Sequence, residues 1–187
     1  MKTYPVEPFD NVFLLKPNIF KDERGCFFES YQKECLNEVL GCTLDFVQDN
    51  HSISHRGVAR GLHYQWDNPM GKLVRVVAGH AIDIVVDIRK QSETFGKYQL
   101  INLSEVNKVQ VWIPPGFAHG FLALKDDTHL LYKCTSYYNK DGEASINLFD
   151  EEIGAPWDIF CKKTEMILSE RDINAQSLSN YMKDFKF

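Results

Sequence analysis

Short apolar or alternating runs recur along most of the chain, and residues that favour turns separate them. Many short strands with turn signals between them and little helix are typical of a β-sandwich or β-barrel. The pattern therefore predicts an all-β fold in a single domain over residues 1–187. We predict strands at residues 11–15, 26–31, 46–50, 72–78, 81–87, 98–103, 108–113, 121–124 and 129–135.

Turn residues between neighbouring runs also predict which strands pair. Gly79 and the residue after it separate residues 72–78 from residues 81–87, and we predict a hairpin there. A second hairpin is predicted between residues 98–103 and residues 108–113. In an antiparallel sheet, such hairpins would place neighbouring runs side by side.

Helical segments are few. Residues 32–40 have helical character and stop at Gly41, which suits a C-terminal cap. A short terminal helix is predicted over residues 173–187, and a charged turn over residues 21–25. These elements are expected at the periphery of the β-fold.

The composition narrows the class of partner. Hydrophobic residues make up 44% and charged residues 25% of the chain, as in an ordinary globular protein. A formal net charge of −5 argues against nucleic acid as the main partner. The N-terminus has no apolar core of signal-peptide type and no run approaches membrane-spanning length, so we expect a cytoplasmic protein with no membrane partner. Five cysteines without a CxxC pair predict small buried thiols in a reducing compartment.

Polar side chains recur on otherwise apolar runs in three segments, residues 60–65, 113–121 and 130–138. The first contains a permanent cation, Arg60, and a residue that transfers protons near neutral pH, His63. The alternative is an edge strand that carries a hydrogen-bonded histidine. Recurrence in three segments favours a lined pocket over that alternative.

A metal site is the first chemistry to test. Residues 114–119 match the PxGxxH half of the cupin pattern, but the place of its His-x-His pair reads His63-Tyr64-Gln65. His63 and His119 without an obvious carboxylate fall short of the three protein ligands usual in a catalytic site. We therefore expect no metal. Nucleophile-elbow and dinucleotide-binding motifs are absent, so no cofactor is expected either.

General acid–base chemistry uses the residues that are present. His63 could remove a proton, and a phenol such as Tyr132 could return one from another direction. Lys72 or Arg60 could stabilise a developing oxyanion. This set needs no metal and no redox cofactor.

A base such as His63 needs a carboxylate that orients its imidazole. Asp172 and Asp83 are the two candidates. Asp172 could instead cap the last helix, and Asp83 could instead pair with a nearby arginine. Strict alternation also places Arg60 and His63 on opposite faces of a strand. Both face one pocket only if a bulge lies between them, and Gly61 is the expected place.

Several ordered motifs carry a family resemblance at matching separations: KDERGCFFES at 21–30, FVQDNHSIS at 46–54, RGLHYQ at 60–65, KLVRVVAG at 72–79, VDIR at 86–89, PPGFAHGF at 114–121, YKCTSYY at 132–138 and LSERD at 168–172. In these motifs the chain resembles the dTDP-4-dehydrorhamnose 3,5-epimerase family. The resemblance implies a cupin-type double-stranded β-helix, a jelly-roll barrel with short peripheral helices, that forms a homodimer. It also implies a nucleotide-sugar substrate, a nucleotide-linked 4-keto-6-deoxyhexose, and no metal or redox cofactor.

The resemblance assigns roles residue by residue. It implies that His63 is the base, that Asp172 rather than Asp83 pairs with it, and that Tyr132 is the acid. Lys72 would polarise the C4 ketone together with Arg60. Further positions would bind the substrate: Gln48, Asn50, His119 and Tyr138 in the pocket, and Arg24 and Glu29 on an N-terminal strand that reaches the partner subunit.

The implied reaction is the epimerisation of dTDP-4-keto-6-deoxy-D-glucose at C3 and C5, which gives dTDP-4-keto-L-rhamnose in deoxysugar biosynthesis. Two alternatives remain open from the sequence. One is a mono-epimerase that inverts only C3 or only C5 of a related nucleotide sugar. The other is a non-catalytic cupin that binds a sugar nucleotide.

Overall fold

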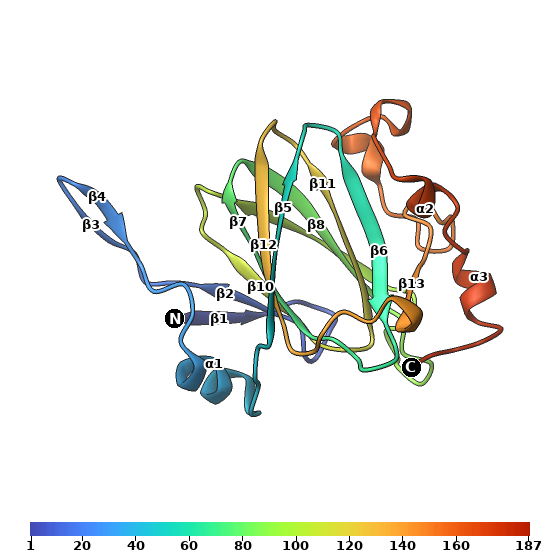
Figure 1. The fold of residues 1–187 in the computed structure, drawn as a ribbon, viewed down its shortest axis with the longest axis horizontal. Helices are drawn as coiled ribbons and strands as arrows, with labels where there is room; N and C mark the ends of the chain where they lie inside the picture. The colour runs from blue at the N-terminus through green and yellow to red at the C-terminus, as the bar shows by residue number, and fades with distance from the viewer.

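Two antiparallel sheets face each other in the computed structural model, which describes residues 1–187 (Figure 1). This two-sheet jelly roll with short peripheral helices confirms the predicted all-β fold. The six-stranded sheet has the order β1 (Lys2–Pro5), β2 (Phe13–Lys16), β10 (Gln110–Ile113), β7 (Lys72–Ala78), β12 (Thr128–Cys134) and β5 (Gln48–Ser54). The five-stranded sheet has the order β13 (Glu143–Ser145), β6 (Ala59–Gln65), β11 (Phe117–Ala123), β8 (His80–Asp87) and β9 (Tyr98–Ser104).

Several strands that follow one another along the chain lie in opposite sheets. β7 pairs with β10 and β12, whereas β8 pairs with β9 and β11. The predicted hairpins between β7 and β8 and between β9 and β10 are therefore wrong, although all four strands are present. Turn residues mark where a strand ends, but they do not choose its partner. Either pairing would bury the same alternating apolar side chains, so the choice depends on the whole fold.

The main core fills the space between the two sheets. Every second side chain of each strand points inward, as the period of a β-strand requires. Val74 and Leu130 of the six-stranded sheet meet Val85 and Phe121 of the five-stranded sheet in one cluster of 15 buried residues. Burial of such side chains contributes about 1.5–3 kcal/mol each. This cluster holds the sheets together and leaves one end of the sandwich for polar side chains.

The C-terminal segment covers the outer face of the five-stranded sheet (Figure 1). Leu62 and Ile84 of that sheet pack against Trp157, Leu178 and Tyr181. The predicted terminal helix over residues 173–187 is only partly correct, because the one-turn helix Leu178–Tyr181 is the helix that lies within this range. Ser169 and Ser177 each cap a separate helix of one turn, and between them Gln176 forms an isolated β-bridge with Ile146. The short helices of this region are η1 (Lys140–Gly142), η2 (Trp157–Ile159), η3 (Lys163–Glu165), α2 (Glu170–Ile173) and α3 (Leu178–Tyr181).

Helix α1 (Lys33–Leu40) lies below the six-stranded sheet and confirms the predicted helix (Figure 1). The side chain of Gln32 accepts a hydrogen bond from the backbone N–H of Cys35 and begins the helix. Gly41 ends it with φ +64°, the left-handed conformation that glycine adopts without strain. Leu36 buries the helix in a small cluster with Leu15, Leu73 and Trp112. None of the three α-helices is long and apolar enough to cross a membrane.

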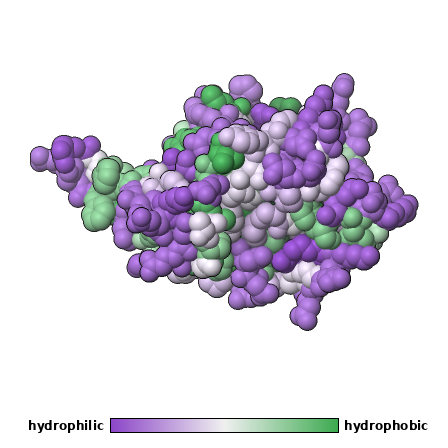
Figure 2. Space-filling view, turned by 60° about the horizontal axis from the view of Figure 1, so that its bottom comes forward, coloured by the Kyte–Doolittle hydropathy of each residue, from purple (hydrophilic) through white to green (hydrophobic).

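A small hairpin projects from the body of the molecule (Figure 1). It consists of β3 (Phe20–Asp22) and β4 (Gly25–Phe27), joined by the predicted charged turn. The predicted strand at residues 26–31 is therefore only partly correct, because β4 ends at Phe27. Phe20 is 64% exposed and Phe27 is 72% exposed. Figure 2 shows hydrophobic surface on this arm behind a hydrophilic tip.

Candidate active site

A polar cleft opens between the two sheets at one end of the sandwich. Its walls come from β5, β7 and β12 of one sheet and from β6 and β13 of the other. The cleft has about 620 Å³ of open space, part of which is continuous with the surrounding solvent. Its lining residues are Gln48, Asn50, His63, Tyr64, Gln65, Met70, Lys72, Tyr132, Tyr138 and Glu143.

His63 and Asp172 form a close pair at the wall of the cleft. Nε2 of His63 lies 2.6 Å from Oδ1 of Asp172, which is only 3% exposed. Burial raises the pKa of Asp172, but the hydrogen bond and charge of His63, together with contacts from Ser169 and Gly61, outweigh burial and hold that pKa below its ordinary value. Asp172 lies within α2, and Ser169 is the cap of this helix. A charged carboxylate therefore orients the imidazole.

A β-bulge brings Arg60 and His63 to the same face of β6, as the sequence predicted. His63 is paired with His119 and Arg60 with Phe121, so three steps along β6 match two steps along β11. Gly61 carries φ +116°, and a Cβ there would lie 2.6 Å from Cα of Gly120. Nε of Arg60 donates a hydrogen bond to Oγ of Ser54 at 3.3 Å.

Lys72 and Tyr132 face His63 from the opposite sheet. Nζ of Lys72 lies 5.8 Å from the centre of the Tyr132 ring. Burial lowers the pKa of Lys72, and the nearby Cys134, Glu143 and Asp83 oppose that shift. Burial also raises the pKa of Tyr132. At neutral pH the phenol is therefore protonated and able to donate a proton.

His119 and Asp83 form a second buried pair. Nε2 of His119 lies 2.7 Å from Oδ2 of Asp83, and both side chains are buried. The alternative of an arginine partner for Asp83 is therefore wrong. Burial raises the pKa of Asp83, while His119 and Lys72 act in the opposite direction. His119 lies behind the cleft lining rather than on its surface.

Gln48, Asn50 and Tyr138 line the mouth of the cleft. Nε2 of Gln48 donates to Oδ1 of Asn50 at 3.1 Å, which confirms that both lie on one face of β5. The backbone N–H of Tyr138 donates to Oε1 of Gln48 at 2.9 Å. The Tyr138 side chain is half exposed, so its ring is accessible to a flat ligand.

Glu143 and Arg171 also belong to this site, although neither was predicted from the sequence. Nη1 of Arg171 lies 2.6 Å from Oε2 of Glu143, and Nε of Arg171 donates to Oγ of Ser145 at 3.2 Å. Glu143 lines the cleft; burial, and after it the hydrogen bond and charge of Glu143, raise the pKa of Tyr138. The one feature that could have indicated Arg171 as a site residue is its position directly before Asp172 on the same short helix. Glu143 sits in a polar stretch where nothing in the sequence distinguishes it.

Arg24 and Glu29 lie outside the cleft of their own chain. Both belong to the projecting arm and its root, and both are exposed. Nη2 of Arg24 binds Oδ2 of Asp22 at 2.5 Å within the arm. One chain alone therefore does not bring these two side chains to the cleft.

The cysteines form no disulfide, and the residues of the types that bind metals do not cluster. All five cysteines are free thiols, and only Cys134 is buried. The expectation of small buried thiols is thus wrong for Cys26 and Cys42, which are exposed. No group of three or more His, Cys, Asp or Glu side chains is arranged to hold a metal ion.

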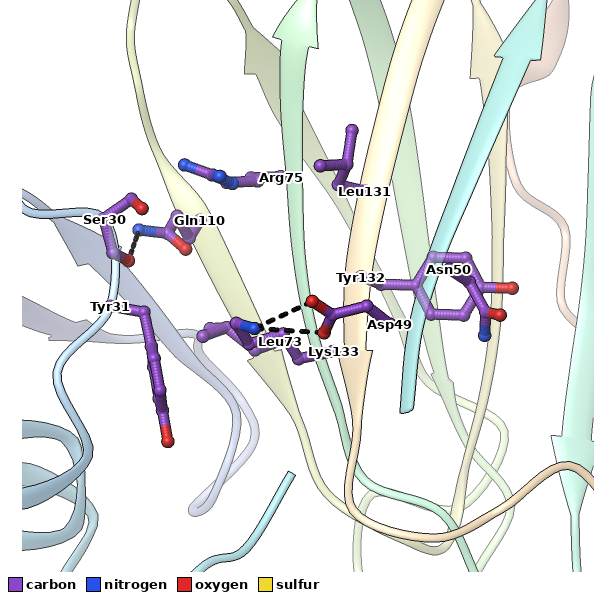
Figure 3. A pocket seen from close by; sticks show the side chains of 10 residues that line it. All are labelled: Ser30, Tyr31, Asp49, Asn50, Leu73, Arg75, Gln110, Leu131, Tyr132 and Lys133. Atoms are coloured by element: carbon purple, nitrogen blue, oxygen red, sulfur yellow. Dashed lines mark hydrogen bonds and ion pairs between the residues drawn. The ribbon is translucent and has the colours of Figure 1, made fainter. Parts of the chain in front are cut away.

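A separate crevice lies on the outer face of the six-stranded sheet, next to the root of the arm (Figure 3). It has about 380 Å³ of open space, and none of His63, His119 and Asp172 lines it. In it, Nζ of Lys133 binds both carboxylate oxygens of Asp49 at 3.0 Å. Asn50 and Tyr132 line both this crevice and the cleft, whereas His63 and Lys72 line only the cleft.

Comparison with known proteins shows that the chain is similar to many other sequences and solved structures. A family profile described as dTDP-4-dehydrorhamnose 3,5-epimerase matches residues 7–180. A protein of that name from Salmonella typhimurium strain LT2 is 51% identical over 148 residues, which are 79% of this chain and 81% of the relative. The crystal structure of a dTDP-6-deoxy-D-glucose-3,5-epimerase from Legionella pneumophila Philadelphia 1 in complex with dTDP-4-keto-L-rhamnose has a TM-score of 0.90 at 43% identity, over 95% of this chain and 93% of that one. A 3'-monoepimerase from Streptomyces bikiniensis in complex with dTDP-quinovose has a TM-score of 0.87 at 31% identity, over 95% of this chain and 90% of that one.

Proposed function

We propose that this chain, which belongs to the dTDP-4-dehydrorhamnose 3,5-epimerase family, inverts C3 and C5 of dTDP-4-keto-6-deoxy-D-glucose to give dTDP-4-keto-L-rhamnose. The observation that carries this proposal is the His63–Asp172 pair, which faces Tyr132 and Lys72 across the cleft. A base and an acid on opposite walls are what inversion of a carbon centre requires. The product is an intermediate for deoxysugar biosynthesis.

The proposed reaction begins at the base. Asp172 accepts the Nε2–H of His63, which leaves the lone pair of Nδ1 free to take a proton. Both C3 and C5 neighbour the C4 ketone, so loss of either proton gives an enolate. The ammonium of Lys72, together with Arg60, stabilises the developing oxyanion.

Reprotonation from the other face completes the inversion. The C–H bond breaks as His63 takes the proton, and a new C–H bond forms with the proton of the Tyr132 hydroxyl. Solvent then returns a proton to the phenolate and removes one from the imidazolium. The ketone is already present in the substrate, so the proposed cycle has no redox step and uses no cofactor.

The remaining site residues are proposed to bind the substrate. Gln48 and Asn50 would hydrogen-bond it at the mouth of the cleft, and Tyr138 would stack on the base of the nucleotide. His119, which lies behind the cleft lining and next to His63, would support the sugar site from that side. The carboxylate of Glu143, neutralised by Arg171, would accept hydrogen bonds from sugar hydroxyls.

A homodimer is part of the proposal. Helix α1 covers only part of the outer face of the six-stranded sheet, and the arm beside it exposes Phe20 and Phe27. A second copy would cover both surfaces, and its arm would bring Arg24 and Glu29 towards the neighbouring cleft. The free thiols agree with a cytoplasmic location, which we propose as well.

One experiment separates the candidate reactions. The protein is incubated in heavy water with dTDP-4-keto-6-deoxy-D-glucose, and deuterium is followed by NMR at each carbon. Label at C3 and C5 supports the double epimerase. Label at a single carbon supports the mono-epimerase, an alternative favoured by the similarity to the 3'-monoepimerase. No label at any carbon overturns both enzymatic functions and leaves a sugar-nucleotide-binding protein.

A further inference from the structure

Asp83 is an unusual residue for the interior of a β-sandwich. Its side chain is 0% exposed, and it points from β8 into the space between the sheets. Oδ2 accepts a hydrogen bond from His119, but Oδ1 is buried without any hydrogen-bond partner. A buried carboxylate oxygen without a partner destabilises a fold, by about 1–3 kcal/mol or more for a charged group. Its presence therefore calls for a role other than stability.

The position of His119 links Asp83 to the proposed base. His119 of β11 lies directly opposite His63 of β6 in the strand register. Side chains at paired positions share one face of the sheet, so the two imidazoles are neighbours inside the barrel. Asp83 accepts the Nε2–H of His119 and thereby sets its ring orientation. Two His–Asp pairs thus lie side by side.

Lys72 links Asp83 to the proposed oxyanion site. Lys72 is partly buried, and negative charge nearby stabilises an ammonium that is partly removed from water. The groups whose charges act on it are Cys134, Glu143, Asp83 and Arg171. Of these, Glu143 already pairs with Arg171 at 2.6 Å. Burial raises the pKa of Cys134, so this thiol is neutral near pH 7.

We propose that Asp83 is a positioning residue for the epimerisation, which holds His119 beside His63 and supplies the buried negative charge that keeps the Lys72 ammonium in place. This inference rests on the proposed function of the same cleft. Asp83 touches no substrate atom and acts through its two neighbours. Its unpartnered oxygen, Oδ1, is buried with it.

The test compares Asp83→Asn with Asp87→Asn. Both aspartates lie on β8 with fully buried side chains, but Asp87 binds Arg89, Ser92 and Thr94 away from the cleft. We expect Asp83→Asn to lower kcat at least ten-fold with little change in KM. Asp87→Asn is expected to keep kcat per folded molecule, with a lower Tm.

The pH dependence distinguishes positioning from a structural role. Removal of a negative charge lowers the pKa of a neighbouring cation, so the alkaline limb of kcat is expected at lower pH in Asp83→Asn. The Lys72 side-chain titration, followed by NMR of labelled lysine without substrate, should move in the same direction. An unchanged kcat profile or an unchanged Lys72 titration overturns the proposal. If the wild-type protein shows no exchange, the proposed function has failed, and the titration still tests Asp83.

A second variant covers the case in which Asp83→Asn does not fold. His119→Gln keeps a hydrogen-bond donor for Asp83 and removes the imidazole. A loss of kcat with an unchanged Lys72 titration supports the division of roles between His119 and Lys72. Wild-type turnover in His119→Gln overturns the part of the proposal that concerns His119.

Discussion

His63 and Asp172 are 109 positions apart in the chain, yet Nε2 of one lies 2.6 Å from Oδ1 of the other. The contact joins the middle of β6 to a one-turn helix near the C-terminus. It orients the imidazole and holds the pKa of Asp172 below its ordinary value.

Loss of this carboxylate should affect the reaction more than the fold. We expect Asp172→Asn to lower kcat by about 10²- to 10⁴-fold, because the amide orients the ring without stabilising the imidazolium. The exposed Glu170 lies on the same helix, so Glu170→Gln is the matched control and should retain wild-type kcat. Equal kcat values for the two variants would contradict the role of Asp172.

Asp172 should also change how the stability of the fold depends on pH. Its pKa is lower in the folded state than in the unfolded chain, so its charge stabilises the fold above the unfolded value near 3.8. This stabilisation is lost as the pH falls through the lower, folded-state pKa. We therefore expect the unfolding free energy of the wild type to fall more steeply below about pH 4 than that of Asp172→Asn. Urea titrations from pH 2.5 to 6 measure this difference, and parallel curves would argue against it.

Tyr132→Phe should separate proton removal from inversion. Without the phenol, His63 can still remove a proton and return deuterium from the same face. We expect substrate to gain deuterium while epimer formation falls by about 10²- to 10⁴-fold. Tyr137→Phe, at a largely exposed neighbouring tyrosine, serves as the control. Loss of exchange together with inversion would show that Tyr132 does more than reprotonate.

Gly61→Ala tests the bulge that aligns Arg60 with His63. The new Cβ would lie 2.6 Å from Cα of Gly120, at a residue with φ +116°. We expect a loss of about 2–5 kcal/mol in unfolding free energy, from backbone strain and overpacking together. Gly25→Ala is the matched control, since Gly25 has φ +129° but a Cβ there meets nothing within 4 Å. Gly25→Ala should lower the unfolding free energy by about 1–3 kcal/mol, or by less because the arm is exposed. Equal losses in urea denaturation would mean that close approach to Gly120 is unimportant.

Phe27→Asp tests the arm as a dimer element. Phe27 is 72% exposed in one chain, and a charge there should oppose its burial against a second copy. We expect a shift from dimer to monomer in sedimentation velocity and a rise in KM, since Arg24 would no longer reach the neighbouring cleft. Val106→Asp, at a turn residue that is 79% exposed, should change neither property. A monomeric wild type would refute the homodimer directly.

Local features of the chain were readable from the sequence. Most strands, the helix that ends at Gly41 and the bulge at Gly61 follow from alternation, capping and the conformational freedom of glycine. Each of these depends on neighbours within a few positions. The resemblance to a family then supplied Asp172 as the partner of His63, a choice that the residues alone left open between Asp172 and Asp83.

Longer-range relations needed the tertiary structure. The sequence did not reveal that β7 and β8 lie in opposite sheets, because a turn and an alternating pattern are compatible with either arrangement. Nor did it reveal the pairing of Asp83 with His119, 36 positions apart, or of Glu143 with Arg171, 28 positions apart. The sequence by itself determined the all-β fold, most of its strands and the residue types available for acid–base chemistry. Only the packing of the two sheets decided which charges meet, because a local pattern records which side chains are buried and not which distant side chain each one contacts.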